Sequence, residues 1–481
     1  MSRKPVYSIP ADTPGTQTIH FYPDPAKKEE EGLPKKVRSY AGYADVDGPG
    51  PAKSHLFYWF FESQTCDPNI DAQAQQQLVD DTPLLIWLNG GPGASSLVGL
   101  FLENGPLRIG TDATGTVTVS PDTWNQEAHV VFWDQPVGSG YSYCETPDTY
   151  VEDEETVGLM FWRALQQFYA TYPEYKKCPL YVCGESYAGK YVPAIARTIH
   201  RKNHEQAGTP LPLAGIAVGN GWIKPELSVR FLIDYAYASG LLGLNQKAVL
   251  DDSYAAFKTV LEEGEKEHDT KKLKQATDLG NGIVNAVVAY GGNFDLYDVR
   301  SWNDLDWGAL PAYLNSQGVK DALHVTSEWL CADNSGPVAE ALKADNMADA
   351  SPWYTELIQA KEQYKVLLYT GDFDTACGYQ STEEILDAIV EPHDAWRKAE
   401  RLIWKQAQGD PKGFVRTLGN VTQVALPGSG HEVPAYQPQI CREMLYNWLS
   451  GRPFRGQDPE RVAQEILAKA QEDARKEKEK G

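Results

Sequence analysis

The strongest constraint on this chain is the hexapeptide Gly184-Glu185-Ser186-Tyr187-Ala188-Gly189. The apolar run Pro179–Cys183 before it predicts a short buried strand, and Lys190–Ile199 after it predicts a helix. A serine among small residues between a strand and a helix is typical of a tight turn that exposes a nucleophilic hydroxyl. The N-terminus of the following helix favours negative charge at the same place. Such matches also occur by chance as ordinary turns, so an acyl-enzyme chemistry needs partners elsewhere in the chain.

Seven short apolar runs predict β-strands. They are His55–Phe61, Pro83–Leu88, His129–Trp133, Pro179–Cys183, Leu213–Val218, Lys365–Thr370 and Val421–Leu426. The later runs are almost continuously apolar, as buried parallel strands are. Between the third and fourth runs, Glu154–Tyr172 carries apolar residues at helical spacing. Strands alternating with helices predict an α/β sheet covered on both faces.

The pattern predicts five segments along the chain. They are an extended or partly disordered arm at 1–36, a first part of the α/β core at 37–222, a cap or lid insertion at 223–350, a second part of the core at 351–456, and a charged helix at 457–481. The arm is rich in proline and charge. The insertion is polar, helix-like and breaks the alternation of strands and helices.

Charge and hydropathy exclude several classes of function. The net charge is −22 and no basic run is interleaved with aromatic residues, which disfavours nucleic-acid binding. No apolar segment reaches about 18 residues, so no membrane span is expected. Met1–Ser8 lacks the apolar region of a secretory signal, which favours an intracellular location, with a secreted or vacuolar location as the alternative if the chain is trimmed. The oligomeric state is left open, a homodimer included.

The seven cysteines are scattered and odd in number, which does not indicate a disulfide framework. None has the spacing of a zinc site with another cysteine or histidine. His431-Glu432 lacks the second histidine of a metalloprotease helix. The sequence therefore implies no metal and no cofactor.

Three histidines after Ser186 are candidates for its general base: His324, His393 and His431. His324 lies in a helix-like run and His393 follows a proline in a loop. His431 lies in a glycine-rich loop directly after the predicted strand Val421–Leu426, and such a loop can reach across a sheet edge. We therefore expect His431 to be the base.

Two aspartates follow the predicted strand Lys365–Leu368, where the active sites of α/β proteins form. Asp372 or Asp374 could orient an imidazole and stabilise its protonated form. The other one could cap a turn or the next helix. The local pattern does not choose between them.

A glycine-rich loop, Asn89–Ser96, follows the predicted strand Pro83–Leu88. It lacks the Lys-Ser/Thr pair of a phosphate-binding P-loop. Backbone amides of such a loop, together with the amide after the nucleophile, can form an oxyanion hole. The expected donors are the amides of Gly91 and Tyr187.

Four motifs stand in the same order along the chain: Trp87-Leu88-Asn89-Gly90-Gly91-Pro92-Gly93, Gly184–Gly189, Gly371-Asp372-Phe373-Asp374 and Gly430-His431-Glu432-Val433-Pro434. Together they resemble the serine carboxypeptidases, an acid-active family of α/β-hydrolase peptidases. The resemblance covers roughly residues 37–455 and thins in the insertion. It implies the α/β-hydrolase fold, with a mixed, mostly parallel central sheet flanked by helices and a largely helical cap.

The resemblance also implies a role for each site residue. It makes Ser186 the nucleophile, His431 the base and Asp374 the orienting acid, and leaves Asp372 structural. It implies that Asn89, Glu103 and Glu185 bind the free C-terminal carboxylate of a substrate, and that Glu432 forms part of the pocket for the leaving residue. Two glutamates can bind a carboxylate only if they retain a proton, so such a site works best in acid.

One position departs from the family pattern. Family members usually carry cysteine where this chain has Ala94, bonded to a distant cysteine that corresponds to Cys331 in Trp329-Leu330-Cys331. That disulfide cannot form here, which, together with the missing signal sequence, favours a reducing compartment or a trimmed chain.

The expected function is a serine carboxypeptidase that hydrolyses the C-terminal peptide bond of peptides through an acyl-enzyme, favoured at acid pH. One alternative is an acyltransferase, esterase or peptide-bond-forming enzyme on the same scaffold, because the acceptor decides what an acyl-enzyme yields. Glu185 and Ser95-Ser96 favour hydrolysis. A second alternative is a catalytically inactive binding module, which the intact triad disfavours. In either enzyme, the expected partner is a peptide or acyl substrate with a free C-terminal carboxylate.

Overall fold

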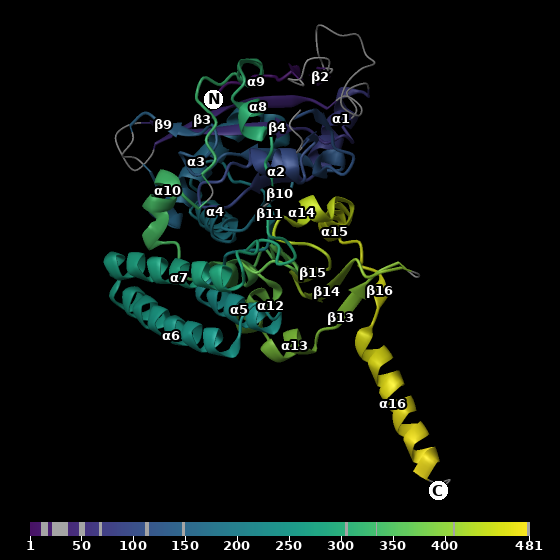
Figure 1. The fold of residues 1–481 in the computed structure, drawn as a ribbon. Helices are drawn as coiled ribbons and strands as arrows, with labels where there is room; N and C mark the ends of the chain where they lie inside the picture. The colour runs from purple at the N-terminus through teal and green to yellow at the C-terminus, as the bar shows by residue number, and fades with distance from the viewer. Residues whose placement is uncertain are drawn as a thin grey trace.

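The computed structural model describes residues 1–10, 18–21, 37–47, 53–66, 70–110, 115–146, 150–303, 306–332, 334–406 and 409–478. Within these residues, a twelve-stranded mixed sheet runs through the molecule (Figure 1). Its strands are β3 (Ser39–Asp47), β4 (Lys53–Phe61), β5 (Leu84–Leu88), β8 (His129–Trp133), β9 (Tyr143–Cys144), β10 (Leu180–Glu185), β11 (Leu213–Gly219), β12 (Lys365–Gly371), β13 (Arg401–Trp404), β14 (Gly413–Leu418), β15 (Val421–Leu426) and β16 (Gly456–Gln457).

The strand order is β16-β13-β14-β15-β12-β11-β10-β5-β8-β4-β3, with β9 paired to β4. The six central strands, from β15 to β8, pair in parallel, and the strands at both edges pair antiparallel. Parallel pairing brings the carboxyl ends of β10, β11, β12 and β15 to one edge of the sheet. Loops at this edge can therefore meet although they lie far apart in sequence.

All seven predicted strands are confirmed, and β8 and β15 begin and end at the predicted residues. Of the strands in this sheet, sequence reasoning missed β3, β9, β13, β14 and β16. The strand β3 (Ser39–Asp47) contains glycine, alanine and aspartate, which strands disfavour. Its full antiparallel register with β4, from Ser39 opposite Phe61 to Asp47 opposite Lys53, stabilises it instead.

Each face of the sheet has its own hydrophobic core. The pleat of β5 directs Leu84, Ile86 and Leu88 into one core and Leu85 and Trp87 into the other. Helices on the first face are α1 (Ala72–Asp81), α3 (Glu154–Thr171), α4 (Ala188–His204), α11 (Ser351–Ile358), α12 (Tyr379–Ile389) and α13 (His393–Lys398). Helices on the second face are α2 (Leu97–Leu102), α14 (Val433–Tyr436) and α15 (Pro438–Ser450), beside the hairpin of β6 (Leu107–Ile109) and β7 (Val117–Val119). Helix α3 confirms the periodicity of 154–172.

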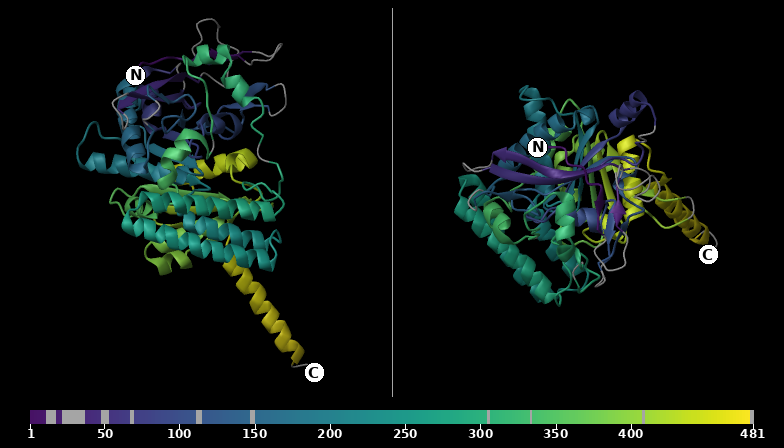
Figure 2. Two further views of the ribbon diagram at one scale, coloured as in Figure 1. Left: turned by 60° about the vertical axis from the view of Figure 1, so that its left-hand side comes forward. Right: turned by 90° about the horizontal axis from the view of Figure 1, so that it is seen from above.

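The insertion divides into two parts. Its first part holds α5 (Pro225–Ala238), α6 (Leu244–Glu267) and α7 (Thr270–Tyr290), which bury a third core that includes Leu232, Phe257 and Ile283. Figures 1 and 2 show α6 and α7 side by side along one flank of the molecule. Its second part holds α8 (Leu310–Leu314), α9 (Gln317–Leu323) and α10 (Gly336–Ala341). Helices α8 and α9 bury apolar residues in the core of the sheet's second face, so only the first part has a core of its own.

The two ends of the chain differ. Val6, Ile9 and Phe21 are buried, and β1 (Ser8–Ile9) pairs with β2 (Ile19–His20). The rest of the predicted arm, 11–17 and 22–36, lies outside the described residues. At the other end, α16 (Pro459–Lys478) stands away from the body of the molecule (Figure 2). No helix among the described residues combines the length and the hydropathy that crossing a membrane requires.

A buried ion pair joins α4 to the end of the insertion. The ammonium of Lys190, whose side chain is fully buried, lies 2.7 Å from a carboxylate oxygen of Asp345 and also donates to the Asp345 carbonyl. Burial, with the nearby Asp345 carboxylate, raises the pKa of Glu154 well above its usual value. Because Lys190 lies four residues after Ser186, this pair ties the helix behind the nucleophile to the insertion.

Replacing Lys190 by methionine should lower the free energy of unfolding by about 3 kcal/mol, because it leaves a largely buried carboxylate without its cation. The change is measured by urea denaturation. Lys177→Met is the matched control: Lys177 is 77% exposed and pairs with Asp80 at 2.9 Å, so its loss should cost below about 1 kcal/mol. Equal costs for the two variants would contradict a structural role for the buried pair.

Candidate active site

Ser186 lies on a strained turn between β10 and α4. Its backbone has φ = 61°, in the left-handed region that serine rarely adopts. Its amide donates to the Gly219 carbonyl at 3.0 Å, and its carbonyl accepts from the amides of Gly189 and Trp222, each at 2.8 Å. These three bonds hold the strained conformation in place, which is typical of a functional turn.

His431 and Asp374 are in direct contact. Nδ1 of His431 lies 2.8 Å from Oδ2 of Asp374, and both side chains are buried. The Asp374 carboxylate also accepts from Asn220 Nδ2 at 2.6 Å and from the amides of Ala376 at 2.8 Å and Cys377 at 3.2 Å. These donors offset the free-energy cost of removing the carboxylate from water, and they fix its orientation toward the imidazole.

The structure distinguishes the two candidate aspartates. Oδ1 of Asp372 accepts from the amide of Gly428 at 2.9 Å, whereas the imidazole of His431 lies against Oδ2 of Asp374. Asp372 therefore braces the loop that leads to His431, while Asp374 contacts the imidazole. This is the arrangement that the family resemblance implied and that the local sequence left open.

Asn220 was not predicted as a site residue. It follows β11, between the strands that lead to Ser186 and Asp374, and has φ = 43°. Its side chain donates to Asp374 and accepts from the Gly371 amide at 3.1 Å. The sequence did offer one signal for this residue, its position between two glycines after an apolar strand. In the structure, Asn220 links the ends of neighbouring strands.

Ser186 opens into a pocket, and the imidazole of His431 packs against a residue that lines it, Tyr297. Ser186, Tyr297 and Cys377 are among the residues that line this pocket. The ring of Tyr297 packs against that of His431 with centroids 4.6 Å apart, and the Tyr297 carbonyl accepts from the His431 amide at 2.8 Å. Ser186, Asp374 and His431 thus follow strands whose carboxyl ends lie at one edge of the sheet.

The helical insertion supplies an apolar wall to the same pocket. Val229 and Leu232 come from α5, and Val284 comes from α7. Gly91 and Tyr187 line the pocket beside Ser186. A substrate at the serine would therefore lie between the sheet edge and the insertion.

The predicted oxyanion loop lies directly against the nucleophile turn. A Cβ at Gly90 would stand 2.4 Å from the Tyr187 amide nitrogen and 2.9 Å from Ser186 Cβ, so only glycine fits. Gly91 has φ = 109°, a backbone conformation that favours glycine. Across the described residues, neither the Gly91 nor the Tyr187 amide donates a hydrogen bond. Both donors are thus available to a ligand.

Asn89 joins two buried glutamates. Its Nδ2 donates to Glu103 Oε1 and to Glu185 Oε1, both at 2.9 Å, while its Oδ1 accepts from Trp87 Nε1 at 2.8 Å and the Gly99 amide at 3.0 Å. The amide is therefore fixed with its two donors toward the carboxyl groups.

Burial determines the protonation of this cluster. It raises the pKa of Glu103, and together with the adjacent carboxyls of Glu103 and Glu432 it raises the pKa of Glu185 well above the usual value. Burial also raises the pKa of Glu432 to about 8. The cluster therefore retains protons at a pH where exposed glutamates are ionised, and a protonated carboxyl can donate to an anion.

Cys331 lies close to Ala94, the position where family members usually carry its cysteine partner. Its Sγ accepts from the amide of Ser95 at 3.2 Å, one residue from Ala94, and all seven cysteines are free. Trp329 Nε1 donates to Ser95 Oγ at 2.8 Å and holds the two segments together without a disulfide.

Comparisons with known proteins point to one family. The model of the serine carboxypeptidase family matches residues 29–451. The chain is similar to a probable serine carboxypeptidase CPVL of Homo sapiens, at 31% identity over 442 residues, which are 88% of this chain and 85% of the relative. It is 31% identical over 423 residues to the vitellogenic carboxypeptidase of Aedes aegypti, covering 85% of this chain and 83% of the relative.

A solved structure supports the fold. A prohormone-processing carboxypeptidase from Saccharomyces cerevisiae aligns with a TM-score of 0.72 and 22% identity, covering 92% of this chain and 96% of that one. The mixed central sheet flanked by helices confirms the predicted α/β-hydrolase fold.

Replacing Gly90 by alanine should slow labelling of Ser186 by a fluorophosphonate at least about a hundredfold, because the new methyl group displaces the backbone that offers the oxyanion donors. Labelling is followed by mass spectrometry. Gly282→Ala in α7 is the control, since its Cβ would meet no atom within 4 Å. Undiminished labelling of Gly90→Ala would refute the proposed contact between loop and nucleophile.

Proposed function

The chain belongs to the serine carboxypeptidase family, and we propose that Ser186, His431 and Asp374 carry out its hydrolysis of C-terminal peptide bonds. The observation that carries this proposal is the contact of Asp374 with His431 beside the pocket that Ser186 lines. A hydroxyl on a strained turn, an oriented imidazole and two free amides are the parts that acyl transfer needs.

Each group has a step in the reaction. His431 accepts the proton of the Ser186 hydroxyl as its oxygen attacks the scissile carbonyl, and Asp374 stabilises the imidazolium that forms. The amides of Gly91 and Tyr187 donate to the oxyanion of the tetrahedral intermediate. The imidazolium then gives its proton to the leaving amine. Water, activated by the same imidazole, hydrolyses the acyl-enzyme.

Restriction to the chain end comes from Asn89, Glu103 and Glu185. A protonated glutamate donates to the substrate's C-terminal carboxylate and so fixes the last peptide bond at Ser186, while Asn89 donates its two amide hydrogens to Glu103 and Glu185 and holds their carboxyls in place. Internal peptide bonds have no such carboxylate. The bonds of Asn89 to both glutamates support this role, because they hold the donors ready before substrate binds.

The same carboxyls favour activity in acid. Their pKa values are raised, so the protonated form persists below these values and is lost as the pH rises through them. Above them the site loses its donor, and two negative charges repel the substrate's carboxylate. Binding of the free chain end therefore weakens toward alkaline pH.

The test is release of the C-terminal residue from matched peptides with a free or an amidated C-terminus. In acid, kcat/KM should be roughly tenfold to a hundredfold higher for the free acid, which corresponds to one hydrogen bond to a charged group. The KM of the free acid should rise with pH, and that of the amide should change little. Ser186→Ala should abolish both reactions.

Glu185→Gln is the matched variant for the pH dependence. The glutamine amide donates at every pH and cannot ionise, so the rise of KM with pH should flatten while the preference for a free C-terminus stays. An equally steep profile in this variant would assign the pH dependence to another group. Equal cleavage of free and amidated peptides by the parent enzyme would refute a carboxypeptidase.

Glu432 follows the proposed base and is partly buried, with its Oε2 shielded from water. We propose that it contacts the side chain of the leaving residue, where it would accept from arginine or lysine. Glu432→Met should lower the ratio of arginine to leucine release about tenfold, which is about 1.4 kcal/mol. The ratio is measured on two peptides that differ only in the last residue.

Glu432→Gln separates charge from size in this experiment. Burial raises the pKa of Glu432 to about 8, but a bound arginine or lysine favours its ionised form. Glutamine keeps the volume of the side chain and cannot ionise, so it should lower the ratio nearly as far as methionine does. An unchanged ratio in both variants would place Glu432 outside the pocket for the leaving residue.

A further inference from the structure

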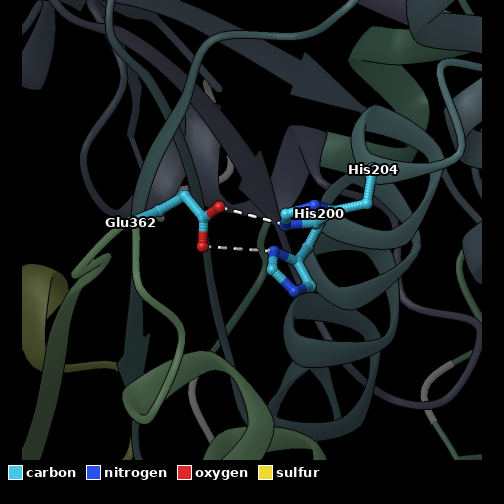
Figure 3. A group of neighbouring side chains, drawn as sticks. All are labelled: His200, His204 and Glu362. Carbon is cyan, nitrogen blue, oxygen red and sulfur yellow. Dashed lines mark ion pairs between the residues drawn. The ribbon is translucent and has the colours of Figure 1, made fainter.

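Two histidines and a glutamate face one another near the surface (Figure 3). His200 and His204 lie one turn apart near the end of α4, and Glu362 lies on the segment before β12. Oε1 of Glu362 is 3.0 Å from His204 Nε2, and its Oε2 is 3.8 Å from His200 Nδ1. Each carboxylate oxygen thus faces a different imidazole.

This spacing suits a tetrahedral metal ion. The three ligand atoms lie within 4.8 Å of one another. Bonds of about 2.0–2.2 Å from zinc to nitrogen and oxygen separate tetrahedral ligands by about 3.4 Å, so small rotations of the side chains suffice. Residues four apart on a helix share one face, which directs both imidazoles to the same point. Three ligands leave the fourth position to water.

A simple ion pair explains this cluster poorly. The two imidazole rings are 4.5 Å apart between centroids, so protonating both would place like charges side by side. His204 is 60% exposed, and an exposed ion pair contributes little to stability. A single divalent ion shared by the three groups balances the carboxylate without charging either ring.

We propose that His200, His204 and Glu362 bind a borderline divalent transition-metal ion, with Zn²⁺ the best fit to two imidazoles and one carboxylate. The ion would join the end of α4 to the segment that leads into β12. Helix α4 begins directly after Ser186, and β12 ends three residues before Asp374. The site is therefore a clamp between two elements that carry the proposed nucleophile and acid.

The metal has no part in peptide hydrolysis. A helix rises about 1.5 Å per residue, so the sixteen steps from Ala188 to His204 place the ion roughly 24 Å from the nucleophile turn. Its effect is on the stability of the folded state, because an ion that binds only this state stabilises it by mass action.

The test uses the full chain stripped with EDTA and titrated with Zn²⁺ alone. Isothermal titration calorimetry should show one ion bound per chain, and Tm should rise with Zn²⁺ concentration. Mg²⁺, which prefers oxygen ligands, should not raise Tm at equal concentration. Absence of both Zn²⁺ effects would overturn the proposal.

Variants assign the ion to this site. His204→Gln and Glu362→Gln should each weaken Zn²⁺ binding at least about tenfold, because losing a ligand costs more than losing an outer partner. Tyr364→Phe is the control: its hydroxyl lies 3.0 Å from His200 Nδ1 and competes for that nitrogen, so its removal should leave the affinity equal or higher. Unchanged affinity in both glutamine variants would overturn the assignment.

Measuring peptidase activity distinguishes zinc bound at this site from zinc bound at a second group of possible ligands. Asp374, Cys377 and His431 also bring ligand atoms within 4.8 Å of one another. Zinc bound there would inhibit hydrolysis and would persist in His204→Gln. Zinc bound to α4 leaves hydrolysis unchanged and is lost in this variant, which keeps the activity of the parent. Inhibition in proportion to all the zinc bound would refute the proposal.

Discussion

The parallel pairing of β10, β11, β12 and β15 is the constraint on which the active site depends. It aligns four strand ends, and each carries one group of the site: Ser186, Asn220, Asp374 and His431. Hydrogen bonds then connect neighbours across the edge, from the Ser186 amide to Gly219, and from Asn220 and His431 to Asp374. A shift of one strand by a residue would turn its side chains to the opposite face and break this row.

Much of this arrangement could be predicted from the sequence because its signals are local. An apolar run followed by glycines predicts a strand end, and this rule located Ser186, His431 and the loop after β5. The choice between Asp372 and Asp374 could not be made in this way, since both follow the same strand and only their contacts with Gly428 and His431 differ. Asn220 was missed because an asparagine between glycines is equally typical of a turn.

The parts of the fold that were not predicted depend on contacts between distant segments. Strand β3 has residues that strands disfavour and is stabilised by its register with β4. Residues 310–329 belong to the predicted insertion by their sequence position, yet their apolar side chains complete the core beneath the sheet. Glu103, Glu185 and Glu432 show a related conflict: burying three carboxyls with raised pKa values weakens the fold, and the binding role proposed for them is what such a cost would support.

The separate core beneath α5, α6 and α7 has a consequence for how such an enzyme diversifies. The buried side chains of these helices pack mainly with one another, while Val229, Leu232 and Val284 reach the substrate pocket. Substitutions in this unit can therefore accumulate without disturbing the sheet that positions the reacting groups. Selectivity for the acyl portion of a peptide can thus drift during evolution while the chemistry stays the same, which makes the helical unit an exchangeable module.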